Sequence, residues 1–172
     1  MKKIFITMCI ILVLSTATKK TNYTDNDIII PKESIRFRII ASSNEIADQI
    51  MKKNIKNQLQ EQIFPLISSA NNIVEARNKI KDNVDNFNSI LSTYDIPYNI
   101  SFGTNFFPEK SLYGINYAAG NYESLVITLG DGIGDNWWCV MFPPLCLLEA
   151  EENDTNNIEY KSFVKEMLSK YF

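Results

Sequence analysis

The sequence contains no histidine, the residue on which most hydrolytic and metal-dependent active sites rely. This absence excludes nucleophilic sites in which a histidine activates a serine or a cysteine. It also excludes most catalytic zinc sites, whose ligands are chiefly histidines. The chain has only six glycines, and none of them falls in a P-loop or a G-x-G-x-x-G pattern, so no phosphate-binding loop is expected.

Basic residues and cysteines are also few. Lys and Arg number 17 against 20 Asp and Glu, which gives a net charge of −3 and no basic stripe. Binding to nucleic acid or to anionic lipid needs clustered positive charge, so neither is expected. Of the three cysteines, Cys9 lies in an N-terminal apolar run, and Cys139 and Cys146 alone cannot complete a four-ligand zinc site. We therefore expect no metal, no cofactor, no small-molecule substrate and no enzymatic activity.

The only long apolar run lies at the N-terminus, where two lysines precede 11 apolar residues and three small residues follow. This order is typical of an export signal, and 11 residues are too few to cross a bilayer, which takes about 20. We predict a signal peptide over 1–17, a polar tether over 18–31 and one domain over 32–172. Cleavage would move the net charge from −3 to −5, whereas retention would leave a transient membrane anchor.

Apolar periodicity in the remaining sequence predicts an α+β domain. Apolar and polar residues alternate at strand spacing over 35–40, 98–102, 123–129 and 137–141, and the last two segments are expected to pair as a hairpin. Apolar residues recur at helical spacing over 46–63, 73–94 and 160–171, while 105–121 is typical of a loop. The predicted fold is a small, mainly antiparallel sheet with two central amphipathic helices and a C-terminal helix packed on one face.

Two capping patterns mark the starts of the central helices. Ser42 is followed by Glu45, and Asn72 is followed by Glu75, which is the spacing of a capping box. Pro65 is expected to end the first of these helices, because proline lacks the amide that an interior helical position donates.

The segment 130–146, GDGIGDNWWCVMFPPLC, concentrates both tryptophans and two of the three cysteines. On an extended chain Cys139 and Cys146 would lie roughly 23 Å apart, whereas a disulfide needs Cα atoms within about 7 Å. The chain must therefore turn back for them to bond, and Pro143-Pro144 is where a turn is expected. Two interpretations remain open, a disulfide that fixes the shape of this loop and two buried free thiols.

The adjacent tryptophans of this segment point to opposite faces of the predicted strand. One of Trp137 and Trp138 is expected in the core, and the other is free to meet solvent, a membrane interface or a partner. An exposed tryptophan beside Phe142 and the stiff Pro143-Pro144 turn would form a preorganised aromatic projection, which is the type of anchor that dominates protein interfaces.

Charged residues give weaker signals. Arg36 and Arg38 are expected on the solvated face of a strand, where they could also bind a carboxylate of a partner. Asp131 and Asp135 are typical turn residues, whose side chains accept hydrogen bonds from nearby backbone amides. Together with Glu123 they support one alternative, a hydrolase that acts on the cell envelope through carboxylate chemistry.

The segment 130–146, together with IRFRIIASSN (35–44) and LYGINYAAGNYES (112–124), resembles the stage II sporulation protein R family of endospore-forming bacteria. The residues that carry the resemblance are Arg36, Arg38, Tyr113, Gly114, Tyr117, Gly120, Tyr122, Glu123 and 130–146. The family pattern does not by itself say which of these residues contact a partner and which hold the fold.

The resemblance implies a signalling protein that is made in the forespore. It is exported into the space between the forespore and mother-cell membranes. There it activates a membrane-embedded aspartic protease, stage II sporulation protein GA, which removes the pro-sequence of sigma-E. On this interpretation the aromatic projection and the two arginines are the expected partner-binding residues, and the chain itself transforms no substrate.

Overall fold

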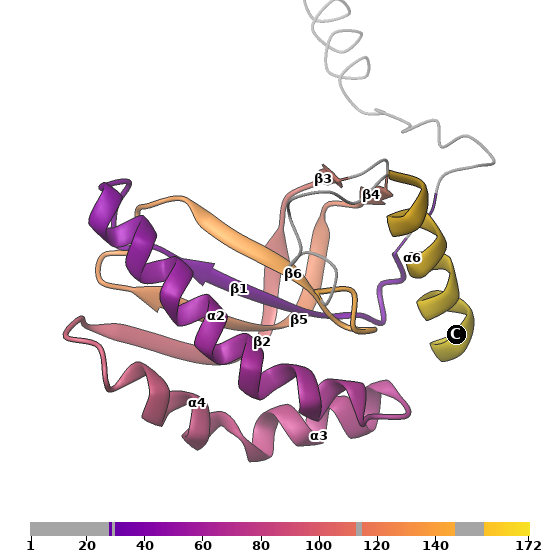
Figure 1. The fold of residues 1–172 in the computed structure, drawn as a ribbon, viewed down its shortest axis with the longest axis horizontal. Coiled ribbons are helices and arrows are strands. Elements are labelled where there is room, and N and C mark those ends of the chain that lie inside the picture. Colours follow the sequence, from indigo (N-terminus) through magenta and orange to yellow (C-terminus); the bar gives the residue numbers. More distant parts are fainter. Residues whose placement is uncertain (1–27, 29, 113–114, 147–156) are drawn as a thin grey trace, which may run out of the picture.

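A four-stranded sheet organises the chain, in the order β2-β5-β1-β6 (Figure 1). The computed structural model describes residues 28, 30–112, 115–146 and 157–172. The strands of this sheet are β1 (Ile35–Ile40), β2 (Tyr98–Phe107), β5 (Gly120–Leu129) and β6 (Asn136–Phe142). β1 is parallel to β5 and antiparallel to β6, and β2 is antiparallel to β5. The sheet is therefore mixed, with two antiparallel pairings of three, and the predicted α+β class is confirmed.

The hairpin predicted between the last two strands is wrong. A short turn joins β5 to β6, but β1 lies between them and pairs with both. Alternating arginines made this strand look half solvated, whereas Arg36 on one face is 0% exposed and Ile35, Phe37 and Ile39 on the other are at most 1% exposed. A strand with both faces covered belongs in the centre of a sheet, and a β5–β6 hairpin would have left β1 at an edge.

Three helices cover one face of the sheet: α2 (Ile46–Ser68), α3 (Ile73–Asp82) and α4 (Val84–Leu91). α2 continues past Pro65 to Ser68, against expectation, although Pro65 has no amide to donate to the Glu61 carbonyl and the helix therefore lacks that one bond. Its first turn is also held differently from the predicted capping box. Ser43, rather than Ser42, accepts a hydrogen bond from the Glu45 amide at 3.1 Å.

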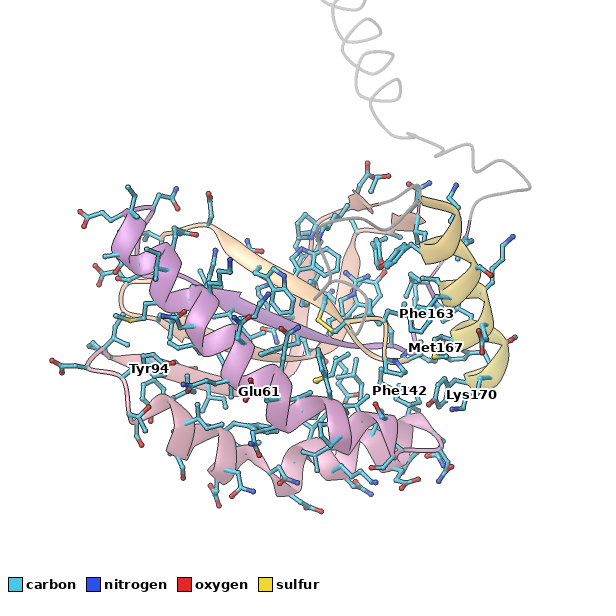
Figure 2. The ribbon with its side chains drawn as sticks, in the orientation of Figure 1. Glu61, Tyr94, Phe142, Phe163, Met167 and Lys170 are labelled. Atoms are coloured by element: carbon cyan, nitrogen blue, oxygen red, sulfur yellow. A yellow bond between two sulfur atoms is a disulfide. The ribbon has the colours of Figure 1, made fainter. Side chains whose placement is uncertain are left out.

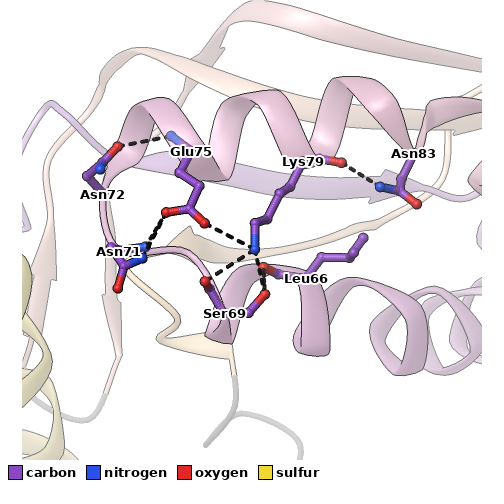
Figure 3. Close-up of polar contacts among 7 residues, drawn as sticks. All are labelled: Leu66, Ser69, Asn71, Asn72, Glu75, Lys79 and Asn83. Atoms are coloured by element: carbon purple, nitrogen blue, oxygen red, sulfur yellow. Dashed lines mark hydrogen bonds and ion pairs between the residues drawn. The ribbon is translucent and has the colours of Figure 1, made fainter.

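The second predicted helix is two helices with a break at Asn83. Its predicted start is confirmed, since the Asn72 side chain accepts a hydrogen bond from the Glu75 amide at 3.0 Å (Figure 3). The Lys79 ammonium then donates to the Ser69 hydroxyl at 2.7 Å and closes the corner between α2 and α3. At the break, the Asn83 side-chain amide donates to the Lys79 carbonyl and so caps the end of α3.

The sheet separates two hydrophobic cores. The larger core lies between the sheet and α2, α3 and α4, and it includes Phe37 and Cys139. The second core lies on the opposite face. There β3 (Lys110–Leu112) pairs with β4 (Ile115–Tyr117), and β4 and α6 (Asn157–Tyr171) contribute side chains to the core. The prediction that all helices pack on one face is therefore wrong for α6, whose Tyr160 and Val164 belong to the second core.

The predicted signal peptide over 1–17 and most of the predicted tether over 18–31 lie outside the described residues. In the part of the chain that the structure describes, none of the helices combines the length and the apolar character that a bilayer crossing requires.

Candidate functional site

Arg36 is fully buried in the second core, with an exposed fraction of 0%. Its guanidinium carbon lies 3.4 Å from the ring centroid of Tyr122, 4.7 Å from that of Trp138 and 4.9 Å from that of Phe107. No hydrogen-bond partner for its three guanidinium nitrogens lies among the described residues. Burial removes water from the cation and lowers the pKa of Arg36 well below its ordinary value, to about 10. The expected solvated position is therefore wrong, because α6 and the β3–β4 pair cover this face.

Arg38 also turns inward. Its guanidinium carbon lies 3.8 Å from the ring centroid of Phe107, and its Nη2 donates to the Phe106 carbonyl at 2.9 Å. Partial burial lowers the pKa of Arg38. The side chain therefore links β1 to the end of β2, across the intervening β5, and binding of a partner carboxylate by Arg38 stays a prediction.

The expected aromatic projection is not exposed. Trp138 is 6% exposed and packs edge-on against Phe107 and Tyr117 in the second core. Phe142 is 1% exposed and points toward α6, where its ring meets Tyr171 edge-on at 4.9 Å (Figure 2). α6 thus covers the surface on which the projection was expected.

Pro143 and Pro144 form the expected turn, and both are buried. The Leu145 amide donates to the Pro143 carbonyl at 2.7 Å, and the peptide bond that precedes Pro143 is cis. These prolines therefore shape the end of β6 from inside the fold. A partner contact through them, as through Trp138 and Phe142, would require this end of the domain to open.

A disulfide joins Cys139 to Cys146, with Cα atoms 5.5 Å apart. Of the two interpretations left open by the sequence, the bonded one is therefore confirmed. Both cysteines belong to the larger core, so the bond fastens the turn after β6 to the strand itself.

Replacing both cysteines with alanine is expected to lower the free energy of unfolding by about 2 kcal/mol, because the short closed loop no longer restricts the unfolded chain. Urea unfolding of the oxidised protein and of the double variant measures the difference. Dithiothreitol should destabilise the wild-type protein by a similar amount and leave the variant unchanged. Equal midpoints for the oxidised and reduced wild-type protein would contradict the structural role of the bond.

Trp137 is the partly exposed member of the tryptophan pair. Its ring packs edge-on against Phe37 at 5.6 Å and forms one wall of a pocket of about 290 Å³ between β6 and α2. The residues that line this lysine pocket are Gln49, Lys52, Lys53, Lys56, Asn136 and Trp137. The indole therefore lies between the larger core and the pocket, to which it gives an aromatic wall.

The lysines of the pocket have different partners. Lys52 donates to the Gln49 side chain at 2.6 Å and to the Asp135 carbonyl at 2.8 Å, and burial lowers its pKa against the opposing attraction of Asp135. The Lys56 ammonium lies 5.1 Å from the ring centroid of Trp137. No ion pair joins Lys52, Lys53 or Lys56 to a carboxylate in the described ranges. The two ion pairs found there both use basic residues of α3.

Three exposed isoleucines lie at the same end of the molecule. Ile46 and Ile50 on the first turns of α2 are 80% and 54% exposed, and Ile133 in the turn after β5 is 78% exposed. Backbone bonds from Ile133 to Ser42 and from Gly134 to Ala41 hold that turn against the segment that leads into α2. We call these three side chains the isoleucine rim. Ile46 and Ile50 precede the pocket lysines on α2, and Ile133 precedes Asn136 and Trp137 in the turn before β6.

The three predicted carboxylates do not form one site. Glu123 lies on β5, and its two carboxylate oxygens accept hydrogen bonds from two guanidinium nitrogens of Arg77, at 2.6 and 2.8 Å. These hydrogen bonds raise the pKa of Arg77. Asp131 and Asp135 are exposed in the turn beyond the other end of β5. The part of β5 that lies between Glu123 and this turn is roughly 20 Å long. Glu123 is therefore not paired with Asp131 or with Asp135.

Sequence reasoning missed the lysines of the pocket, although a signal existed. Ile50 and Ile55 are five residues apart, so one regular stripe cannot include both. The buried stripe of α2 is Ile55, Leu59, Ile63 and Ile67, and Met51 continues it one turn earlier. This shift of phase places Ile46 and Ile50 on the surface, beside the lysines at 52, 53 and 56.

Together, the described residues define a disulfide-linked α+β domain with a basic and aromatic surface pocket, a type of site that binds a ligand or a partner. The family model described as Stage II sporulation protein R matches residues 31–152, and the chain belongs to this family. A role in sporulation follows from this membership. Most of the described arginine and aromatic residues that carried the resemblance prove to be buried, and these are Arg36, Tyr117, Tyr122, Trp138 and Phe142. Tyr113 and Gly114 lie outside the described residues.

The chain is also similar to the Stage II sporulation protein R of Bacillus subtilis (strain 168), with 34% identity over 145 residues. The match covers 81% of this chain and 63% of the relative, so the chain spans less than two thirds of the relative's length. No solved structure matches.

Proposed function

We propose that this chain is an exported signalling protein of sporulation that activates the membrane-embedded aspartic protease stage II sporulation protein GA. Activation of that protease would promote removal of the pro-sequence of sigma-E in the mother cell. Membership of the family, through a match over residues 31–152, carries the proposal. The disulfide adds support, because such bonds persist in compartments outside the cytoplasm.

On this proposal the chain is released from the forespore into the space between the two membranes and acts by binding. A signal of this kind must bind the active state of the protease more tightly than the inactive state, because equal affinity shifts no equilibrium. Among the predicted contact residues, Trp137 has the partly exposed ring that such binding requires. The lysine pocket and the isoleucine rim therefore form the surface that fits this role best.

The test is a reconstitution of the protease in lipid vesicles with pro-sigma-E as its substrate. Adding the purified protein without the predicted signal segment, residues 18–172, which keeps the buried Ile28 and Ile30 of the second core, is expected to raise the rate of cleavage at least about tenfold. This corresponds to about 1.4 kcal/mol of preference for the active state. A protease that cleaves at the same rate with and without the domain would refute the proposed function.

A second measurement in the same assay examines the surface. Replacing Trp137 with alanine is expected to weaken activation about tenfold, since a rigid indole anchor is lost. The control is Phe106→Ala, which removes an aromatic ring that is 60% exposed on β2, far along the sheet from the pocket. Urea unfolding establishes that both variants fold. Equal activation by the two variants would exclude Trp137 as a contact.

A further inference from the structure

The lysine pocket gathers positive charge on a chain whose net charge is −3. Lys52, Lys53 and Lys56 lie within two turns of α2, so their ammonium groups repel one another. Two acids belong to the segments that flank these lysines. Asp48, on the preceding turn of α2, accepts a hydrogen bond from Ser43, and Asp135, in the turn before β6, attracts Lys52. Neither forms an ion pair with a pocket lysine.

We infer that the lysine pocket binds a carboxylate side chain from an acidic segment of a partner protein. The inference rests on the proposed function, because it names the chemistry by which the protease would be recognised. Lys53 and Lys56 supply charge, and the side-chain amide of Asn136 can donate to a carboxylate oxygen, whereas the Gln49 amide already donates to the Ser43 carbonyl and to Asn44. The flat face of Trp137 packs against the methylene groups of the bound acid.

The size and border of the pocket indicate a peptide as the source of the carboxylate. A volume of about 290 Å³ accommodates one or two side chains. The isoleucine rim beside it would pack against apolar residues that flank the acid. The bound sequence is therefore an aspartate or a glutamate with aliphatic neighbours.

An anionic membrane surface fits the same pocket less well. Electrostatic attachment to lipid typically uses clusters of four to eight basic residues, whereas the pocket offers three, on a domain that is acidic as a whole. The lysines also line a concavity with an indole wall, and such a shape selects a side chain rather than a plane of headgroups.

The test reverses the charge of the two lysines that hold no structural hydrogen bond, in the variant Lys53→Glu with Lys56→Glu. Lys52 is kept, because it bonds to the turn before β6. The matched control is Lys32→Glu with Lys165→Glu, which makes the same change in net charge at two exposed positions outside the pocket. The pocket variant is expected to bind the detergent-solubilised protease at least about tenfold more weakly than the control variant, with the difference shrinking at high salt.

Direct binding is measured with the probe peptide acetyl-Leu-Asp-Glu-Leu-amide and nitrogen-15 labelled domain. The indole NH resonance of Trp137 is expected to shift on titration in the wild-type protein and in the control variant, and to stay in place in the pocket variant. Sedimentation with phosphatidylglycerol vesicles examines the other source of negative charge. Vesicle binding that depends on Lys53 and Lys56, without a response to the peptide, would overturn the inference in favour of a lipid.

The two proposals fail in different ways. A wild-type domain that does not activate the protease refutes the proposed function, and the peptide titration then still decides the pocket. A pocket variant that activates as well as the control variant, with an unshifted Trp137 resonance in the wild-type titration, refutes the pocket and leaves the function standing.

Discussion

Replacing Gly134 with alanine is expected to lower the free energy of unfolding by about 3 kcal/mol, the upper end of the usual effect of overpacking. A methyl group at this position would fall 2.5 Å from the carbonyl carbon of Ser43 and closer still to its oxygen. The obstacle is backbone, which cannot move aside as a flexible side chain can. The turn after β5 would have to separate from the segment that leads into α2.

Gly103→Ala is the matched control, since a methyl group on Gly103 in β2 would have no neighbour within 4 Å. It is expected to leave stability within about 0.5 kcal/mol or to raise it slightly, because alanine has fewer unfolded conformations than glycine. Urea unfolding of both variants measures the contrast. Equal stabilities for the two variants would show that the close approach at Gly134 is not a constraint.

The same substitution should also disturb the lysine pocket. The turn that contains Gly134 presents the Asp135 carbonyl to Lys52 and leads directly into β6 and Trp137. A shift of this turn therefore changes two of the groups that shape the pocket. In the nitrogen-15 spectrum, the indole NH resonance of Trp137 should move in Gly134→Ala and stay in place in Gly103→Ala.

Local features of the fold were predictable from the sequence because they depend on near neighbours. The alternation over 35–40 identified β1, and the pairing of Asn72 with Glu75 located the start of α3. The position of β1 between β5 and β6 was not predictable in this way. It is decided by which buried faces meet across the sheet, and the arginines at 36 and 38 hide how apolar the surroundings of this strand are.

The candidate site was predictable only in part, for a related reason. The disulfide required a turn, and Pro143-Pro144 supplied an evident one. The side of β6 on which each tryptophan lies was foreseeable as an alternation, but which of the two is covered depends on α6, which is distant in sequence. Phe142 was misplaced for the same reason, since its cover is Tyr171.

Replacing Arg36 with methionine is expected to raise the free energy of unfolding by about 2 to 3 kcal/mol, although it removes a residue of the family pattern. Desolvation of the buried cation lowers the pKa of Arg36 to about 10, so the charged side chain is unfavourable in the folded protein. Methionine fills a similar length, needs no hydrogen bonds and retains favourable contacts with the surrounding rings. Buried charges replaced by apolar groups of matching size have given gains of this order.

The dependence of this gain on pH follows from the direction of the shift. The unfolded chain holds the proton of Arg36 more tightly than the folded protein does, so the wild-type protein is relatively stabilised as the pH rises above about 10. The advantage of the methionine variant is therefore complete below about pH 10 and shrinks above it.

Arg38→Met is the control, and it should lose about 1 kcal/mol of stability, because its bond to the Phe106 carbonyl disappears. A loss of stability in Arg36→Met similar to that of the control would mean that contacts with Tyr122, Trp138 and Phe107 outweigh the desolvation of the cation, and that the arginine is retained for the stability of the second core.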